Sequence, residues 1–238
     1  MPRFFCDAVT DEEIQIVGED ASHIRRVLRM KVGEALTVCA DGVDYACEIA
    51  GFDGDAVRLT VLEKHPNDSE PSVRVTLYQA LPKGDKMEFI VQKAVELGAV
   101  RIVPMLTKRC VSRPDAKSMQ KKLVRYQKVA KEAAKQCGRG MVPEVGEMVT
   151  LERALAQADS AVKVLFYEGG GQPIQELLDE QSGDVAVFIG SEGGFETEEV
   201  DLAKRSGAKI ATLGKRILRC ETAPLAALSI IMNRTGNI

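Results

Sequence analysis

The chain has 238 residues, of which 45% are hydrophobic and 28% charged, a composition typical of a globular protein with one large or two small domains. No apolar run approaches the roughly 20 residues that span a bilayer, and the acidic start of the chain lacks a signal-peptide core, so we expect a cytoplasmic protein. Two histidines exclude a histidine-rich metal site, and six cysteines without a C-x-x-C pair are expected to be buried thiols.

The net charge of −3 hides two basic segments. Residues 101–139 carry 12 Lys and Arg against 2 Asp and Glu, and residues 23–31 (HIRRVLRMK) contain no acid. One such segment alone could be a solvated helix surface. Two separate basic segments in an otherwise acidic chain favour a polyanionic partner, because each phosphate contact releases condensed counterions.

The first 65 residues predict a small β-rich domain. Short apolar runs at 35–40, 45–50 and 56–62 are separated by Asp-Gly pairs, which favour tight turns. They predict a three-stranded meander. Before it, the spacing of apolar residues predicts a helix over 21–30, with Ser22 as its N-cap and its arginines facing solvent.

A polar segment with two prolines, KHPNDSEPS at 64–72, is the predicted linker. It divides the chain into domains at 1–68 and 73–238.

The second domain alternates strand and helix patterns, which predicts an α/β fold with a largely parallel sheet. The predicted strands cover 73–80, 100–106, 161–167, 184–190 and 210–213. The predicted helices cover 84–97, 115–136, 173–180, 197–206 and 223–232.

Three loops that follow predicted strands are rich in glycine or in cations: 168–171 (EGGG), 190–195 (GSEGGF) and 213–219 (LGKRILR). In a parallel sheet these loops meet at one edge, where ligands bind. The sequence contains neither a P-loop nor a G-x-G-x-x-G after the first strand of this domain. The pattern alone therefore predicts a ligand-binding α/β domain with basic surfaces.

Longer motifs carry a resemblance to a known family. The strings IGSEGGFETEE (189–199) and LGKRILRCETAPLAAL (213–228) resemble the signature of the SPOUT methyltransferases, and specifically of the RsmE family, which methylates N3 of a uridine in 16S ribosomal RNA. Three further segments resemble the same family: HIRRVLRMKVGE (23–34), LPKGDKMEFIVQKAVELG (81–98) and QCGRGMVPEV (136–145). Ser191, Cys220 and Lys135 depart from its usual pattern.

The resemblance implies an N-terminal PUA-like β-barrel that binds RNA and a C-terminal α/β methyltransferase domain with a trefoil knot. It also implies a homodimer, S-adenosylmethionine as cofactor, and helix 44 of the small ribosomal subunit's 16S rRNA as substrate, with no metal and no membrane. The implied cofactor-binding residues are Gly169, Gly170, Ile189, Gly190, Gly193, Gly194, Leu213, Gly214, Ile217, Leu218, Thr222 and Ala223.

Methylation of a uridine at N3 requires loss of the N3 proton and stabilisation of the charge that develops on the base. The candidate stabilisers are Arg139, Arg109, Gln136 and Arg219. The candidate bases are Glu192 and Glu221, although a glutamate near a helix start more often complements the helix dipole.

The candidate RNA-binding residues come from both predicted domains: Arg3, His23, Arg25, Arg26, Arg29, Lys83, Lys86 and Arg113. Two alternatives to the leading hypothesis remain open. One is a SPOUT enzyme that acts on another RNA or base, and the other is a non-catalytic RNA-binding factor in ribosome assembly.

Overall fold

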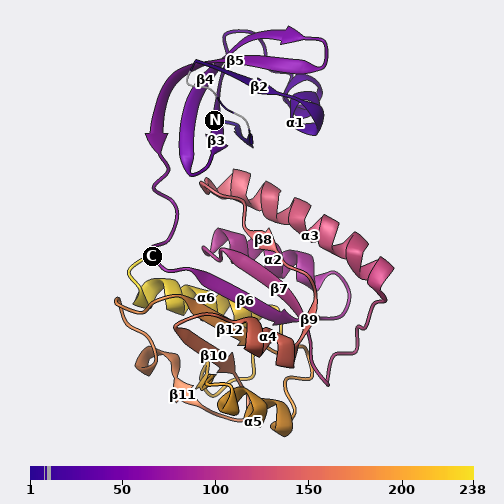
Figure 1. Ribbon diagram of the computed structural model, residues 1–238, viewed down its shortest axis with the longest axis vertical. Coiled ribbons are helices and arrows are strands. Elements are labelled where there is room, and N and C mark those ends of the chain that lie inside the picture. Colours follow the sequence, from indigo (N-terminus) through magenta and orange to yellow (C-terminus); the bar gives the residue numbers. More distant parts are fainter. Residues whose placement is uncertain (8, 10–11) are drawn as a thin grey trace. The chain divides into compact units, whose positions relative to one another are not determined.

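The computed structural model describes residues 1–7, 9 and 12–238 (Figure 1). Contacts within the chain divide it into two compact units: Met1–Glu70 with Ala134–Val142, and Pro71–Ala133 with Pro143–Ile238. The segment Ala134–Val142, which the sequence analysis included in the second domain, groups with the first unit. We describe each unit by itself.

Unit 1 contains a five-stranded sheet in the order β1-β3-β4-β5-β2. The predicted meander is confirmed as three antiparallel strands: β3 (Ala35–Ala40), β4 (Val43–Asp53) and β5 (Ala56–Pro66). Strands β4 and β5 extend beyond the predicted limits, and β5 enters the predicted linker. The short strands β1 (Arg3–Phe5) and β2 (Glu13–Ile16) complete the sheet and had no clear sequence signal.

The predicted helix over 21–30 differs from the observed structure. An α-helix, α1 (Gly18–Ser22), continues into a π-helical turn, η1 (His23–Val27). Ser22 is the last residue of α1 and makes no capping bond, so its prediction as an N-cap is wrong. The chain needs no cap there because helical backbone continues on both sides. Ile24 is fully buried, whereas Arg25 and its basic neighbours are exposed, as predicted.

The segment Ala134–Val142 is held in unit 1 by Glu70. The Glu70 carboxylate accepts hydrogen bonds from the Gly140 and Met141 N–H groups at 2.8 and 3.1 Å. It also forms an ion pair with Arg139 at 2.6 Å. A second contact runs from the Cys39 thiol to the Gly140 carbonyl at 3.1 Å. These contacts connect residues about 70 to 100 positions apart in sequence, which no local pattern predicts.

Unit 2 contains an eight-stranded sheet whose main order is β11-β13-β10-β12-β6-β7-β8, with β9 also paired to β7, and every pairing is parallel. The predicted parallel α/β fold is confirmed. The strands are β6 (Val75–Ala80), β7 (Arg101–Leu106), β8 (Glu144–Val145), β9 (Val149–Thr150), β10 (Val162–Phe166), β11 (Gln172–Pro173), β12 (Val185–Ile189) and β13 (Lys209–Thr212).

The helices are α2 (Lys86–Glu96), α3 (Ala116–Cys137), α4 (Leu151–Gln157), α5 (Thr197–Arg205) and α6 (Thr222–Arg234). Helix α4 and the short strands β8 and β9 were not predicted from the sequence. Its helix over 173–180 is wrong: the segment forms β11 and one 3-10 turn, Ile174–Glu176. Gln172 and Pro173 pair with β13 through backbone hydrogen bonding, which replaces a helical start.

Helices cover both faces of the unit 2 sheet, so β12 is buried along its whole length. Ala186 and Phe188 face one core, together with residues of α4 and α5. The Phe188 ring stacks on Tyr78 with centroids 4.8 Å apart. The alternate residues of β12 face the side where α2 and α6 pack against each other. The trefoil knot stays a prediction, because strand order by itself does not establish threading.

Candidate functional site

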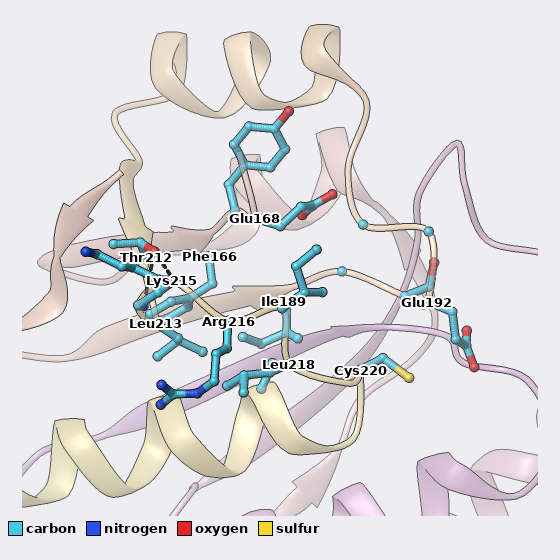
Figure 2. Close-up of a pocket in the computed structure, with 18 residues that line it drawn as sticks. Phe166, Glu168, Ile189, Glu192, Thr212, Leu213, Lys215, Arg216, Leu218 and Cys220 are labelled. Carbon is cyan, nitrogen blue, oxygen red and sulfur yellow. Dashed lines mark hydrogen bonds between the residues drawn. The ribbon is translucent and has the colours of Figure 1, made fainter. Parts of the chain in front are cut away.

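A cavity of about 260 Å³ lies in unit 2, at the carboxyl ends of three neighbouring parallel strands (Figure 2). Strands β13, β10 and β12 are adjacent in the sheet, and the loop that follows each of them contributes to the cavity wall. This is the edge at which the sequence analysis expected a ligand. The lining residues are Phe166, Tyr167, Glu168, Ile189, Gly190, Ser191, Glu192, Gly193, Gly194, Thr212, Leu213, Gly214, Lys215, Arg216, Ile217, Leu218, Cys220 and Ala223.

The loop after β12 approaches itself so closely that it needs glycine. A Cβ added to Gly190 would lie 2.9 Å from the Gly194 Cα. Gly194 has a φ of +67°, and a Cβ there would overlap the Glu168 carboxylate. A hydrogen bond of 2.9 Å from the Gly194 N–H to the Ser191 carbonyl closes the turn. The loop therefore presents backbone to the cavity without side chains in the way.

The cavity wall combines apolar side chains with buried polar atoms. Phe166, Ile189 and Leu218 supply apolar surface. Within the part of the chain that the structure describes, the buried Ser191 hydroxyl has no hydrogen-bond partner. Gln79, at the end of β6, is outside the lining: its amide oxygen is also buried without a partner among the described residues, and its nitrogen donates to the carbonyl of the lining residue Gly190 at 3.2 Å. Such a wall suits a ligand with an aromatic part and hydrogen-bonding groups.

Lys86, at the start of α2, connects two of the three loops. Its ammonium lies 3.2 Å from the Glu192 carboxylate in the loop after β12. It also lies 3.1 Å from the Glu221 carboxylate, just before α6. The Lys83 N–H donates to Glu192 at 3.1 Å, so the loop before α2 takes part in the same cluster.

The cluster lowers the pKa of both candidate bases. Burial raises the pKa of Glu192, but backbone N–H groups and Lys86 outweigh it and leave the pKa below its ordinary value. The Cys220 thiol, which donates to Glu221 at 3.1 Å, lowers the pKa of Glu221, and Lys86 adds to this effect. Burial and the neighbouring Glu221 raise the pKa of Cys220 to about 12, so the thiol stays protonated. Two ionised carboxylates that each face an ammonium are weak proton acceptors at neutral pH.

Arg109 supports the loop after β12 from outside the cavity. Its guanidinium donates to the Gly193 carbonyl at 2.9 Å and forms an ion pair with Glu196 at 3.0 Å. The Glu168 carboxylate lies 3.9 Å away. These contacts place Arg109 beside the cavity, where it holds backbone in position.

Most of the cofactor-binding residues predicted from the sequence surround the cavity. Three of them, Gly169, Gly170 and Thr222, are outside its lining, each adjacent to a lining residue or loop. Eight lining residues were not predicted individually as site residues: Phe166, Tyr167, Glu168, Ser191, Thr212, Lys215, Arg216 and Cys220. Their only signal was position, at the end of a predicted strand, within one of the three predicted loops, or directly after one.

The catalytic candidates belong to both units, so we describe each within its own unit. Glu192 lines the cavity. Glu221 does not, but its carboxylate forms an ion pair with Lys86 and accepts a hydrogen bond from the lining residue Cys220. Arg219 is exposed in the loop after β13. Gln136 and Arg139 belong to unit 1. Gln136 is exposed there, whereas Arg139 is 3% exposed and bound to Glu70. The Arg139 guanidinium is therefore engaged in an ion pair, and its catalytic role stays a prediction.

The basic segment of unit 1 presents its charges outward. Arg25 and Arg26 line a hollow of about 470 Å³. The Arg25 guanidinium lies 5.4 Å from the centre of the Phe52 ring and donates to the Gly54 carbonyl. Arg29 is exposed and has a φ of 55°, an uncommon conformation for a residue with a side chain. His23 is exposed beside the Phe4 ring.

Three other predicted RNA contacts are engaged within the protein. Arg3 forms a two-pronged ion pair with Asp44 at 2.5 and 2.6 Å, and its side chain is 14% exposed. Arg113 donates to the carbonyls of Thr107, Lys108 and Cys110. Lys86 belongs to the carboxylate cluster. Lys83 is exposed, as the prediction requires, and Arg113 is also exposed although its guanidinium donates within the protein.

Among the described residues, no helix is long and apolar enough to cross a membrane. The same part of the chain contains no group of three or more His, Cys, Asp or Glu side chains that could hold a metal ion.

Two family models match the chain. An RNA methyltransferase domain matches residues 69–232, and an RNA methyltransferase PUA domain matches residues 16–62.

Individual relatives match over nearly the whole chain. The ribosomal RNA small subunit methyltransferase E of Bacillus subtilis is 36% identical, covering 99% of this chain and 97% of the relative. That of Mycobacterium tuberculosis is 31% identical, covering 96% and 90%. The crystal structure of the Neisseria gonorrhoeae protein of the same name, bound to S-adenosyl methionine, superposes with a TM-score of 0.89 at 30% identity, covering 98% and 97%.

Proposed function

Because the chain belongs to the family of ribosomal RNA small subunit methyltransferase E, whose members methylate rRNA with S-adenosylmethionine, we propose that it methylates N3 of a uridine in helix 44 of 16S rRNA. The reaction then takes place in the cytoplasm, where ribosomal subunits are assembled. The observation that carries the proposal is the cavity at the carboxyl ends of β10, β12 and β13, lined by the loops that hold the family's motifs.

The cavity fits S-adenosylmethionine. Its glycine loop leaves room that a single Cβ would fill, and the unpartnered Ser191 hydroxyl offers a hydrogen bond. Phe166, Ile189 and Leu213 would enclose the adenine, and main-chain groups of the three loops would read its edge. When bound, the cofactor supplies an electrophilic methyl group.

The protein's own contribution is to hold uracil and stabilise the charge that develops on its oxygens. Backbone N–H groups at Glu192, the Cys220 thiol at Glu221, and Lys86 at both lower the pKa of these carboxylates, so we propose that neither removes the N3 proton. Arg219 is exposed between the lining residues Leu218 and Cys220, which suits it to face uracil O2 or O4. A cation there would lower the pKa of N3, so that solvent can take the proton.

We also propose that the protein is a homodimer. Helix α6 buries Leu228, Ile231 and their neighbours in unit 2, but Leu225 and Ile230 are only half-buried. A second copy would cover these apolar side chains.

The test compares small-subunit rRNA from cells with and without this gene. Mapping of modified nucleotides should reveal one N3-methyluridine that is missing without the gene and restored by the purified protein with S-adenosylmethionine. Restoration of a methyl group at another base would assign the chain to the alternative SPOUT activity. Unchanged methylation would support the non-catalytic alternative.

A further inference from the structure

Lys215 and Arg216 occupy an unusual position at the cavity. They follow Gly214 in the loop after β13, and both line the cavity while their side chains remain exposed. The next residue, Ile217, also lines it and is 83% exposed, an uncommon exposure for a large apolar side chain. The Gly214 N–H donates to the Thr212 hydroxyl at 3.2 Å, which anchors the loop to the strand.

Within the described chain, neither Lys215 nor Arg216 has a carboxylate within 4.0 Å, in contrast to three cations of unit 2 near the cavity or on α3. Lys86 pairs with two glutamates at 3.1 and 3.2 Å, Arg109 with Glu196 at 3.0 Å, and Arg125 with Glu88 at 2.8 Å. Adjacent unpaired cations repel each other, so the pair gains most from an anion supplied from outside.

The cavity has charge of opposite sign on its two sides. Figure 2 shows the side chains of Lys215 and Arg216 near Leu213, away from Glu192 and Cys220. An anionic group that approaches the cavity is therefore attracted to the loop after β13 and repelled by the acidic side.

We propose that Lys215 and Arg216 form a phosphate-binding site for the RNA strand that presents the target base to the cofactor. This inference rests on the proposed function. A nucleotide whose base reaches the bound cofactor keeps its phosphates at the mouth of the cavity, where these two side chains extend. Exposed Ile217 would then pack against the extruded base or its neighbour. Phosphate contacts of this kind set position and carry no sequence information.

Two other anions could use the same charges: the carboxylate of the cofactor and an acidic surface of a second copy of the chain. Two long, exposed cations extend farther than one enclosed carboxylate requires, and each can hold a different phosphate of a polyanion. RNA is therefore the favoured partner, and the other two are outcomes of the test.

The experiment uses the full chain with Lys215→Ala and Arg216→Ala combined, and Lys209→Ala as the matched control. Lys209 is exposed at the amino end of β13, the strand that precedes this loop, and so lies at the end of the strand opposite the cavity. Binding to 16S rRNA from cells that lack this gene is measured over a series of salt concentrations, with cofactor affinity by calorimetry and molecular mass by light scattering.

We expect the double variant to bind rRNA about tenfold or more weakly. Its salt slope should be flatter by roughly 1.4 to 1.8, because two phosphates are no longer neutralised. Cofactor affinity and mass should not change, and Lys209→Ala should match the wild type. Weaker cofactor binding with an unchanged salt slope would assign the charges to the cofactor carboxylate. A lower mass would assign them to a second copy, and no change in either would also overturn the proposal. A different methylated base would contradict the proposed function without altering this comparison.

Discussion

Lys86 and Glu192 lie 3.2 Å apart, and the same ammonium reaches Glu221 at 3.1 Å, so one side chain joins the loop after β12 to the start of α6. The three side chains are between 23% and 32% exposed. Their value is therefore geometric: each partly exposed pair contributes little energy, but together they determine the separation of two loops that line the cavity.

Replacement of Lys86 by Met should weaken cofactor binding by about fivefold, because two unpaired carboxylates then repel each other across the cavity edge. Calorimetry measures the affinity, and Lys86→Arg should restore most of it. If Lys86→Met binds cofactor normally but binds rRNA poorly, Lys86 is the RNA contact that the sequence suggested.

The same cluster predicts a pH dependence. Glu192 and Glu221 have lowered pKa values in the folded protein, so their stabilising effect is complete above the ordinary glutamate pKa of about 4.3. It is lost as pH falls through the lowered values. In Lys86→Met the carboxylates titrate at higher pH, and their protonation relieves the mutual repulsion, so the cofactor affinity of this variant should approach that of the wild type as pH falls. Identical pH profiles for the two proteins would contradict the cluster.

Gly194→Ala should weaken cofactor binding, because its Cβ would displace the Glu168 carboxylate from its place at the cavity. Gly207→Ala is the matched control: Gly207 has a φ of +81°, similar to the +67° of Gly194, but a Cβ there meets nothing within 4 Å. Both variants incur backbone strain of about 1 kcal/mol, so only the loss specific to Gly194 reports on the site. Equal affinities in calorimetry would remove this loop from the cofactor site.

Arg139→Met should destabilise the protein by about 2–4 kcal/mol, because it leaves the Glu70 carboxylate, only 22% exposed on its side chain, without its cation. Denaturant unfolding measures this loss, and Glu70→Gln should cause a loss of the same kind. At temperatures where it is folded, Glu70→Gln should keep the wild-type kcat. If Arg139→Met has normal stability but a much lower kcat, the result would support a catalytic role for Arg139.

Arg25→Ala with Arg29→Ala should weaken rRNA binding and flatten its salt slope by roughly 0.7 to 0.9 for each phosphate that is no longer neutralised. Cofactor affinity should not change, since neither residue lines the cavity. Arg205→Ala, which removes an exposed charge at the end of α5, serves as control. An unchanged slope in the double variant would make these arginines ordinary solvated side chains.

Several features were determined by the sequence alone. The alternation of the longer strands and helices in unit 2, the β3–β4–β5 meander and the edge that bears the cavity follow from local periodicity, turn residues and loop glycines, whereas α4, β8, β9 and β11 do not. These signals act over a few residues, and a parallel sheet brings the ends of its strands together whatever their exact lengths.

Only the tertiary structure decided how individual charges are used. Lys86, Arg3 and Arg113 look like their neighbours in the sequence, yet each is bound to acceptors within the protein, while Lys215 and Arg216 have no carboxylate partner among the described residues. Glu70 binds Arg139, 69 residues away in sequence, and both residues belong to unit 1, together with the rest of Ala134–Val142. The physical reason is range: an ion pair depends on distances between side chains of a few ångströms, and the folded backbone sets those distances without regard to separation in sequence.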